Sequence, residues 1–211
     1  MRTRIKVCGI TRVDDALRAA ALGVDALGFV FWPKSPRFLS PRAAAAIAAA
    51  LPPFVATVGV FVDQPLDEIR AIAAEVGLSA VQLHGDEPAG MWTRVPGRCI
   101  RAVGAVDGLD AAEIAAWPAA VWPLLDAHDP DRRGGTGRTI DWDLAARVAR
   151  ARRIILAGGL DAFNIRDAIA RVGPFAVDVS SGVEREPGVK DAARLRAFVE
   201  GVAAADAAQV P

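Results

Sequence analysis

Few side chains in this sequence can ligate a metal or form a disulfide. The chain has two cysteines, Cys8 and Cys99, and two histidines among its 211 residues. The cysteines have neither the even, dense pattern of a disulfide scaffold nor the spacing of a metal site. Two histidines are too few for a histidine-rich metal centre. We therefore expect two reduced thiols and no bound metal.

The sequence also lacks an excess of charge and a long apolar run. Its 25 basic and 25 acidic side chains cancel, and no block of like charges occurs. Such a chain has no net field to attract nucleic acid or a membrane surface. No apolar run approaches the length of a membrane span, and the apolar segment after Arg4 is too short for a signal peptide. We expect a cytoplasmic protein with no nucleic-acid or membrane partner.

The composition supports one sizeable hydrophobic core. The hydrophobic share is 53%, and no linker or low-complexity segment divides the chain. A chain of 211 residues with this share can bury a core without splitting into domains. We expect a single domain over residues 1–211, with a frayed C-terminal tail from about residue 205.

Short β-branched runs alternate with alanine-rich amphipathic segments. This alternation predicts parallel strands joined by crossover helices. Strands are expected at 5–8, 26–31, 56–61, 80–83, 100–103, 121–125, 154–157 and 176–179. Helices are expected near 13–22, 42–51, 66–76, 88–94, 110–116, 143–150, 164–171 and 190–204. This pattern predicts an α/β fold, a (β/α)8 TIM barrel, whereas a doubly wound sheet would normally have fewer strands.

Local sequence features mark several element boundaries. Pro123 removes a backbone donor from the sixth predicted strand, and proline is tolerated in a strand only at an edge, a bulge or an end. The expected N-caps are Ser40 and Asp141 or Asp143, and the expected helix stops are Gly23 and Gly77.

Polar side chains gather where the predicted strands run into the following loops, which is where barrels of this class carry their chemistry. Cys8 ends the first strand and Asp126 the sixth, and a thiol with a carboxyl group can remove one proton and add another. Alternation places Cys8 inside the barrel with Lys6, whose ammonium would favour the thiolate. Further polar strand ends are Trp32–Arg37, Asp63, Gln82–Asp86, Gly134–Arg138, Ala157–Leu160 and Asp178–Gly182.

Glycines and serines follow the seventh and eighth strands. Glycine lets backbone N–H groups approach a ligand closely, and a short helix N-terminus adds partial positive charge. Barrels of this class commonly bind phosphate at these two loops. We therefore expect a phosphorylated small-molecule substrate, bound by Gly158, Gly159, Ser180, Ser181 and Gly182.

Eight short motifs in a fixed order make the chain resemble the phosphoribosylanthranilate isomerase family of tryptophan biosynthesis. They are Lys6–Thr11, Gly28–Phe31 with Ser35–Arg37, Val58–Val62, Val81–Asp86, Leu124–Asp126, Gly134–Gly137, Ala157–Leu160 and Asp178–Glu184. One such motif would mean little, but the ordered set at strand ends is specific. The resemblance covers nearly the whole length. Trp32 stands where a tyrosine is expected, and Asp129–Arg133 adds a charged stretch to the sixth loop.

The resemblance implies an Amadori rearrangement of N-(5'-phosphoribosyl)anthranilate to 1-(2-carboxyphenylamino)-1-deoxyribulose 5-phosphate. It implies Asp126 as the general acid for the ribose ring oxygen and Cys8 as the general base for the C2′ proton. No cofactor is needed, because the iminium nitrogen is the electron sink. Arg37 suits bidentate binding of the anthranilate carboxylate, and Trp32 would cover the aromatic ring.

Further implied substrate-binding residues are His84 and Asp178. Some relatives also accept a histidine-pathway aminoaldose, and the sequence leaves that open. It equally leaves open whether the chain is a monomer or a homodimer.

Each of these residues also has a purely structural interpretation. A free cysteine such as Cys8 is more often packing than chemistry. Asp126 could cap a loop, and Arg37 could be a solvated cation. His84 could hold a loop by donating to a backbone carbonyl, and His128 could face solvent.

Two other kinds of function compete with the isomerase. A pentulose-phosphate epimerase or an indole-forming synthase would share the phosphate loops, but the first needs histidine and aspartate metal ligands and the second a lysine acid. A non-catalytic binder of a phosphorylated ligand is also compatible with the fold. Such a binder would have no reason to keep both Cys8 and Asp126.

Overall fold

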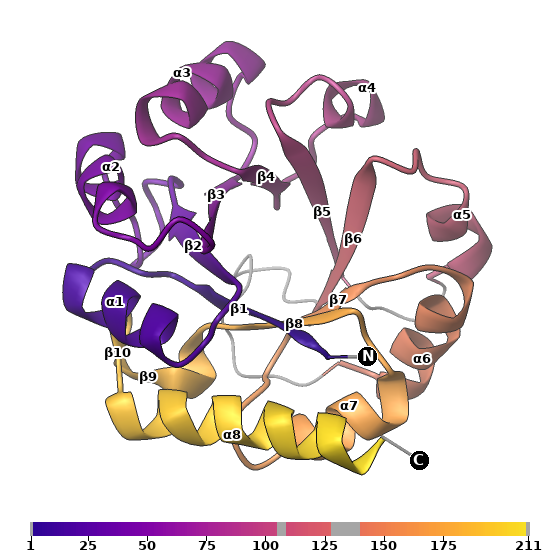
Figure 1. Ribbon diagram of the computed structural model, residues 1–211. Coiled ribbons are helices and arrows are strands. Elements are labelled where there is room, and N and C mark those ends of the chain that lie inside the picture. The colour runs from indigo at the N-terminus through magenta and orange to yellow at the C-terminus, as the bar shows by residue number, and fades with distance from the viewer. Residues whose placement is uncertain (1, 105–108, 128–139, 210–211) are drawn as a thin grey trace.

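Parallel strands close into a barrel surrounded by helices (Figure 1). The structure is a computed structural model that describes residues 2–104, 109–127 and 140–209. Each strand pairs with its neighbours in chain order, and β8 returns to pair with β1. The barrel strands are β1 (Arg4–Cys8), β2 (Ala26–Val30), β3 (Ala56–Phe61), β4 (Ala80–Leu83), β5 (Arg98–Gly104), β6 (Val121–Asp126), β7 (Ile155–Leu156) and β8 (Ala176–Val179). The predicted (β/α)8 barrel is confirmed.

A helix follows each barrel strand. These are α1 (Val13–Ala21), α2 (Pro41–Ala49), α3 (Leu66–Val76), α4 (Ala89–Trp92), α5 (Ala111–Ala115), α6 (Trp142–Ala151), α7 (Ile165–Val172) and α8 (Ala192–Ala208). The expected caps are confirmed for Ser40, whose side chain accepts from the N–H of Ala43, and for Asp141 rather than Asp143. Gly77 ends α3 with a φ of 72°, in the left-handed region that glycine adopts without strain.

The strand that contains a proline is part of the barrel. β6 pairs with β7 only through Leu124 and Leu125. Pro123 lies one residue before that pairing begins. The Leu125 carbonyl accepts from the N–H of Ala157 in the chain that follows β7 (2.8 Å), so the backbone groups of Pro123, two residues earlier, also face β7. The missing N–H of Pro123 therefore falls before the first β6–β7 pair, at an end of that ladder, where a strand tolerates proline.

The C-terminal segment differs from the sequence prediction. Helix α8 continues to Ala208, and Ala205 is buried. The carboxylate of Asp206 accepts hydrogen bonds from the backbone N (2.9 Å) and Oγ1 (2.6 Å) of Thr3. These contacts hold the end of α8 against the start of β1, so the prediction of a frayed tail from about residue 205 is wrong within the described chain.

A small two-stranded sheet, which the sequence did not predict, precedes α8. A short 3-10 turn, η1 (Ser181–Val183), leads into β9 (Glu184–Glu186), which pairs antiparallel with β10 (Val189–Lys190). The last helix was expected from residue 190 but begins at Ala192. Lys190 therefore lies on a strand and not on the helix.

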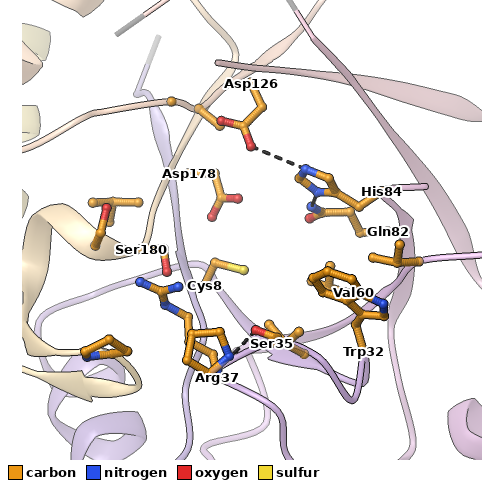
Figure 2. Close-up of a pocket in the computed structure, with 18 of the residues that line it drawn as sticks. Cys8, Trp32, Ser35, Arg37, Val60, Gln82, His84, Asp126, Asp178 and Ser180 are labelled. Carbon is orange, nitrogen blue, oxygen red and sulfur yellow. Dashed lines mark hydrogen bonds and ion pairs between the residues drawn. The ribbon is translucent and has the colours of Figure 1, made fainter. Parts of the chain in front are cut away.

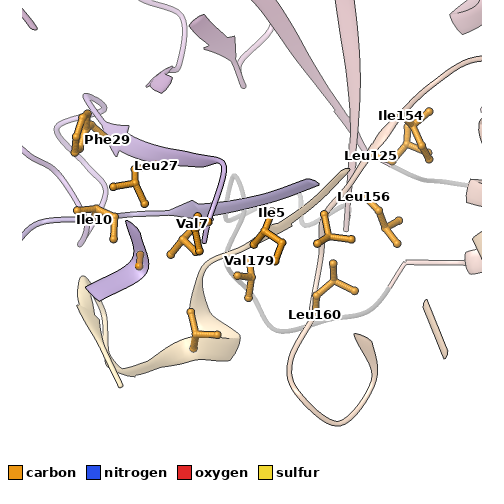
Figure 3. Close-up of a cluster of buried hydrophobic side chains, with 14 of the residues drawn as sticks. Ile5, Val7, Ile10, Leu27, Phe29, Leu125, Ile154, Leu156, Leu160 and Val179 are labelled. Atoms are coloured by element: carbon orange, nitrogen blue, oxygen red, sulfur yellow. The ribbon is translucent and has the colours of Figure 1, made fainter. Parts of the chain in front are cut away.

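The barrel wall separates two layers of buried apolar side chains. Ile5, Val7 and Leu27 point outward and pack under the helices (Figure 3), which is the side opposite to the inward direction predicted for Lys6 and Cys8. A second cluster fills the inside of the barrel. It consists of Val58, Ala80, Ile100, Ala102, Leu124, Ile155, Ala157 and Ala176.

The two ends of the barrel interior have different character. Near the start of the strands, the rings of Trp122 and Phe175 lie 4.8 Å apart and pack against the inner cluster. Near the other end, the buried inward side chains are polar, among them Lys6, Gln82 and Asp178. Apolar packing therefore fills one end and leaves polar groups at the end where the loops follow the strands.

The cap of α6 gives a stability prediction. The Asp141 carboxylate accepts from the N–H groups of Asp143 (2.8 Å) and Leu144 (3.2 Å). Asp141→Ala should lower the free energy of unfolding by about 1 kcal/mol, because two helix-end donors lose their partner. Asp141→Asn is the control and should be nearly neutral, since asparagine caps equally well. Equal losses for both variants in urea denaturation would contradict the capping role.

Candidate active site

A cavity of about 500 Å³ opens at the end of the barrel where the strands run into the following loops (Figure 2). Side chains from opposite sides of the barrel converge on it. The residues that line it include Cys8, Trp32, Ser35, Arg37, Val60, Gln82, His84, Asp126, Gly158, Gly159, Asp178, Ser180 and Ser181. Nine of the ten site residues expected from the sequence are in this set, and the tenth, Gly182, lies next to Ser181 in η1.

A buried ion pair forms the floor beneath Cys8. Lys6 Nζ donates to Asp178 Oδ2 at 2.7 Å, and the two side chains are 4% and 7% exposed. The residues lie opposite one another in the β1–β8 pairing. Cys8 follows Lys6 on the same inner face and is partly exposed to the cavity, as alternation predicted.

The electrostatics of Cys8 differ from the sequence expectation. Burial is the largest influence and raises the pKa of the thiol above its ordinary value. The ammonium of Lys6 lowers that pKa, the Asp178 carboxylate raises it, and Lys190 lowers it. Lys6 therefore acts in the expected direction, but burial outweighs it and the free site favours the neutral thiol.

Asp126 lies across the cavity from Cys8 (Figure 2) and is held by two contacts. Its Oδ1 accepts from the N–H of Ala127 at 2.8 Å. Its Oδ2 lies 3.4 Å from His84 Nε2, while His84 Nδ1 lies 2.9 Å from Gln82 Nε2. Where the Gln82 amide donates to Nδ1, the N–H of Nε2 points at Asp126. His84 thus orients the carboxyl group, a contact that the sequence did not reveal.

Arg37 reaches the cavity with half of its hydrogen-bonding fork already engaged. Its Nε and Nη2 donate to the carboxylate of Glu184 at distances of 2.6–3.2 Å. The Arg37 side chain is only 12% exposed, so the alternative that it is merely a solvated cation on the surface is wrong. Burial is the largest single influence on the pKa of Glu184 and raises it, but the hydrogen bonds and charges of Arg37 and Lys190 together outweigh burial and lower that pKa. The third nitrogen of the guanidinium, Nη1, lies on the side away from the Arg37–Glu184 ion pair.

The loops after β7 and β8 have the backbone expected of a phosphate site. Gly158 and Gly159 have φ angles of 82° and 62°, which other residues rarely adopt. A Cβ atom on Gly182 would lie 2.0 Å from the carbonyl oxygen of Leu160, so no side chain fits there. The side chain of Asn164 donates to the Gly159 carbonyl at 2.8 Å and holds the first loop.

Several buried polar atoms at the cavity have no partner. Among the described side chains, Gln82 Oε1, Asp178 Oδ1 and Ser180 Oγ are buried and accept or donate no hydrogen bond. Buried polar groups are normally paired, since leaving one unpaired is costly. All three residues line the cavity. A polar ligand in the cavity would satisfy them.

Lys190 is a buried residue of this region that sequence analysis missed. Its Nζ donates to the backbone carbonyl of Cys8 at 2.6 Å and to Glu184 at 2.7 Å. A Val-Lys pair at an expected helix start gives no sign of such a role. The Asp178–Glu184 motif contains Glu184, which is one of the partners of Lys190, but nothing in the motif indicates that the two residues pair.

Some expectations fall outside this site. Gly134–Gly137, Arg138, His128 and Asp129–Arg133 lie outside the described residues. Cys99 is 3% exposed in the outer core, and burial raises the pKa of its thiol to about 12. Within the described ranges, no group of three or more His, Cys, Asp and Glu could hold a metal ion, and none of the helices there is long and apolar enough to cross a membrane.

The fold and this set of groups define a (β/α)8-barrel enzyme for a small phosphorylated molecule. The family model described as N-(5'-phosphoribosyl)anthranilate (PRA) isomerase matches residues 5–201. The chain belongs to this family, whose members catalyse the Amadori rearrangement of tryptophan biosynthesis.

Individual relatives agree with the family model. The N-(5'-phosphoribosyl)anthranilate isomerase of Pelobacter propionicus is 48% identical over 196 residues, covering 93% of each chain. The crystal structure of the Thermus thermophilus enzyme is similar with a TM-score of 0.88 and 43% identity, covering 96% of this chain and 99% of that one. A second structure is described as a complex with reduced 1-(o-carboxyphenylamino)-1-deoxyribulose 5-phosphate. It has a TM-score of 0.85 and 40% identity and covers 96% and 99% of the two chains.

The close packing around Cys8 gives a prediction for Gly28. A Cβ atom on Gly28 would lie 2.9 Å from Cys8 Sγ and 3.1 Å from Cys8 Cα. Gly28→Ala should displace the thiol and destabilise the fold by about 1–3 kcal/mol through overpacking. Activity per folded molecule should fall as well. Gly90→Ala is the control, because a Cβ there meets nothing within 4 Å. Full activity in Gly28→Ala would show that the thiol position is not constrained.

The raised pKa of Cys8 predicts how its reactivity changes with pH. Iodoacetamide reacts with the thiolate, so the alkylation rate reports the ionised fraction. In the free protein, the rate at Cys8 should rise with pH with a midpoint above the ordinary thiol value of 9.0. Mass spectrometry of the Cys8 peptide measures this separately from Cys99. A midpoint below 9.0 would mean that the two ammonium groups outweigh burial.

Proposed function

We propose that this chain catalyses the rearrangement of N-(5'-phosphoribosyl)anthranilate with Asp126 as general acid and Cys8 as general base. The assignment rests on one observation: a thiol and a carboxyl group line the same cavity. The two expected phosphate loops follow β7 and β8, which lie between β6 and β1 in the closed barrel. The cavity residues come from β1 and β6 for the proton transfers and from the loops after β7 and β8 for the phosphate.

In the first step, Asp126 gives its proton to the furanose ring oxygen. The C1′–O4′ bond breaks, and the nitrogen lone pair forms the C1′=N bond of an open-chain iminium ion. His84 and the N–H of Ala127 fix the carboxyl group in place. A fixed acid needs no reorganisation when the ring opens.

In the second step, Cys8 removes the C2′ proton. The C–H electrons form a C1′=C2′ bond and the iminium electrons return to nitrogen, which gives an enolamine. Protonation at C1′ and loss of the C2′ hydroxyl proton then yield the ketone. Because burial raises the pKa of the thiol, Cys8 must first release its own proton to solvent before it can accept the C2′ proton. The positive charge of the iminium ion favours the thiolate that remains, so the fraction of Cys8 able to act as a base rises when the substrate is ready to lose its proton.

Binding groups stand at two sides of the cavity. The phosphate lies on the backbone N–H groups of the Gly158–Gly159 and Ser180–Gly182 loops, which agrees with the close backbone packing there. Arg37 binds the anthranilate carboxylate through Nη1 and the second proton of Nη2, because Glu184 occupies its other edge. Asp178 Oδ1 and Gln82 Oε1 accept from ribose hydroxyl groups.

The cellular setting belongs to the same proposal. A tryptophan-biosynthesis enzyme of this kind acts in the cytoplasm, without nucleic-acid or membrane partners and without a cofactor. It is expected to act as a monomer or a homodimer, which sedimentation velocity distinguishes. Turnover of freshly prepared phosphoribosylanthranilate, followed as the loss of anthranilate-type fluorescence, tests the activity. No loss above the uncatalysed rate would contradict it.

The acid and the base give a paired prediction. Cys8→Ala and Asp126→Asn should each lower kcat by roughly 10² to 10⁴ and leave substrate affinity nearly unchanged, which is typical of a lost general acid or base. His84→Asn should cost less, because it removes only a contact that orients Asp126. A Cys8→Ala variant that keeps more than about a tenth of the parental kcat would contradict the mechanism.

The role of Arg37 is tested through KM. Loss of charge-assisted hydrogen bonds to a carboxylate costs about 1.5–3 kcal/mol, so Arg37→Ala should raise KM by about 10- to 100-fold and change kcat less. The control is a substrate analogue without the carboxylate, which both proteins should turn over alike. If the parent still turned over this analogue much better than Arg37→Ala does, the loss in the variant would not come from the carboxylate, and Arg37 would not bind it.

A further inference from the structure

One buried ammonium group touches three separate parts of the cavity wall. Lys190 Nζ donates to the Cys8 carbonyl oxygen at 2.6 Å, to Glu184 Oε1 at 2.7 Å and to the Ser180 carbonyl oxygen at 3.3 Å. The Lys190 side chain is 1% exposed. An ammonium has three N–H donors, and here each has an acceptor.

The three acceptors belong to parts with different tasks in the proposed function. Cys8 carries the base, Ser180 begins the phosphate-binding turn, and Glu184 holds the fork of Arg37. We infer that Lys190 is a positioning residue that fixes the base, the phosphate loop and the carboxylate-binding arginine relative to one another. This inference rests on the proposed function of the same cavity.

The backbone of Lys190 is itself fixed, so its ammonium can act as a reference point. The Lys190 N–H donates to Asp15 Oδ2 at 3.0 Å, and Asp15 is 2% exposed in α1. The neighbouring Gly188 accepts from Thr11 Oγ1 at 2.5 Å through its carbonyl and donates to Glu184 Oε1 at 3.2 Å. The small β9–β10 sheet is therefore tied to the loop after β1, and it carries the lysine into the barrel mouth.

The charge of Lys190 also bears on the base. The groups that act on the Cys8 thiol are Lys6 from β1, Asp178 from β8 and Lys190 from β10. Lys190 lowers the pKa of Cys8, so removal of its charge should leave less thiolate at a given pH. A residue that only stabilised the fold would not produce this change.

Two substitutions separate geometry from charge. Lys190→Met removes the donors and the charge. It should lower kcat/KM by about 10- to 100-fold, as expected for groups displaced by about 1 Å. The thiolate fraction of Cys8, measured by alkylation, should fall on the rising part of the pH profile, because the charge that lowers the thiol pKa is lost. Lys190→Arg keeps the charge, but its planar fork cannot reach three acceptors placed around one atom. It should lose kcat/KM with little change in the alkylation profile.

Arg152 offers a matched control at the opposite end of the barrel. Its guanidinium donates to backbone carbonyls around α5 and the start of β6, among them Trp117 at 2.6 Å and Val121 at 2.5 Å. Arg152→Met also removes a cation that organises backbone carbonyls. It should lower the melting temperature but leave kcat, KM and the alkylation of Cys8 as in the parent.

Several outcomes would overturn the inference. One is a Lys190→Met protein with parental kcat, KM and alkylation profile, whatever its melting temperature. If that variant does not fold, parental kcat/KM in Lys190→Arg decides against it. Failure of both to fold would assign Lys190 to the fold and not to the site. An active Cys8→Ala variant would instead refute the proposed function, and the alkylation shift would still test the effect of Lys190 on the thiol.

Discussion

The ion pair between Lys6 and Asp178 lies both where the barrel closes and at the floor of the cavity. The two residues face each other where β1 meets β8, the contact that turns an open sheet into a closed barrel. Breaking a buried pair by removing one partner costs about 3–5 kcal/mol, because the other charge is left uncompensated. Two residues further along these strands, on the same inner face, stand Cys8 and Ser180. The registration that closes the barrel therefore also sets the distance between the base and the phosphate loop.

Above this pair, the cavity holds polar groups whose properties a bound substrate would change. Buried oxygen atoms of Gln82, Asp178 and Ser180 lack partners within the described structure, and burial keeps the Cys8 thiol neutral. Both features cost free energy in the free protein. A substrate with hydroxyl groups, and then a cationic iminium centre, relieves both. The same electrostatics allow Cys8 to act as the base although its pKa is raised, because the cationic electron sink forms before the C2′ proton is removed.

The sequence predicted the features that depend on periodicity and on order along the chain. Alternation gave the strands, the inward direction of Lys6 and Cys8, and the strand ends at which Asp126 and Asp178 lie. Contacts between residues far apart in the sequence could not be obtained in this way. Glu184 pairs with Arg37 across 147 positions, and His84 meets Asp126 only because β4 and β6 lie on either side of β5 in the closed barrel. The short strands β9 and β10 have too few residues to show a period, so Lys190 was assigned to a helix. The C-terminal tail was misjudged because its anchoring contact, from Asp206 to Thr3, joins the two ends of the chain.

A crystal structure with a reduced, unreactive analogue of the product would show directly where the reacting atoms lie. The phosphate should lie on the N–H groups of the Gly158–Gly159 and Ser180–Gly182 loops, and the carboxylate on Arg37. Cys8 Sγ and the Asp126 carboxyl group should lie on either side of the carbon chain, within reach of C2′ and of the former ring oxygen. A phosphate bound at any other loop would contradict the proposed mechanism. So would Cys8 Sγ and the Asp126 carboxyl group lying on the same side of the analogue and out of reach of C2′ and the former ring oxygen.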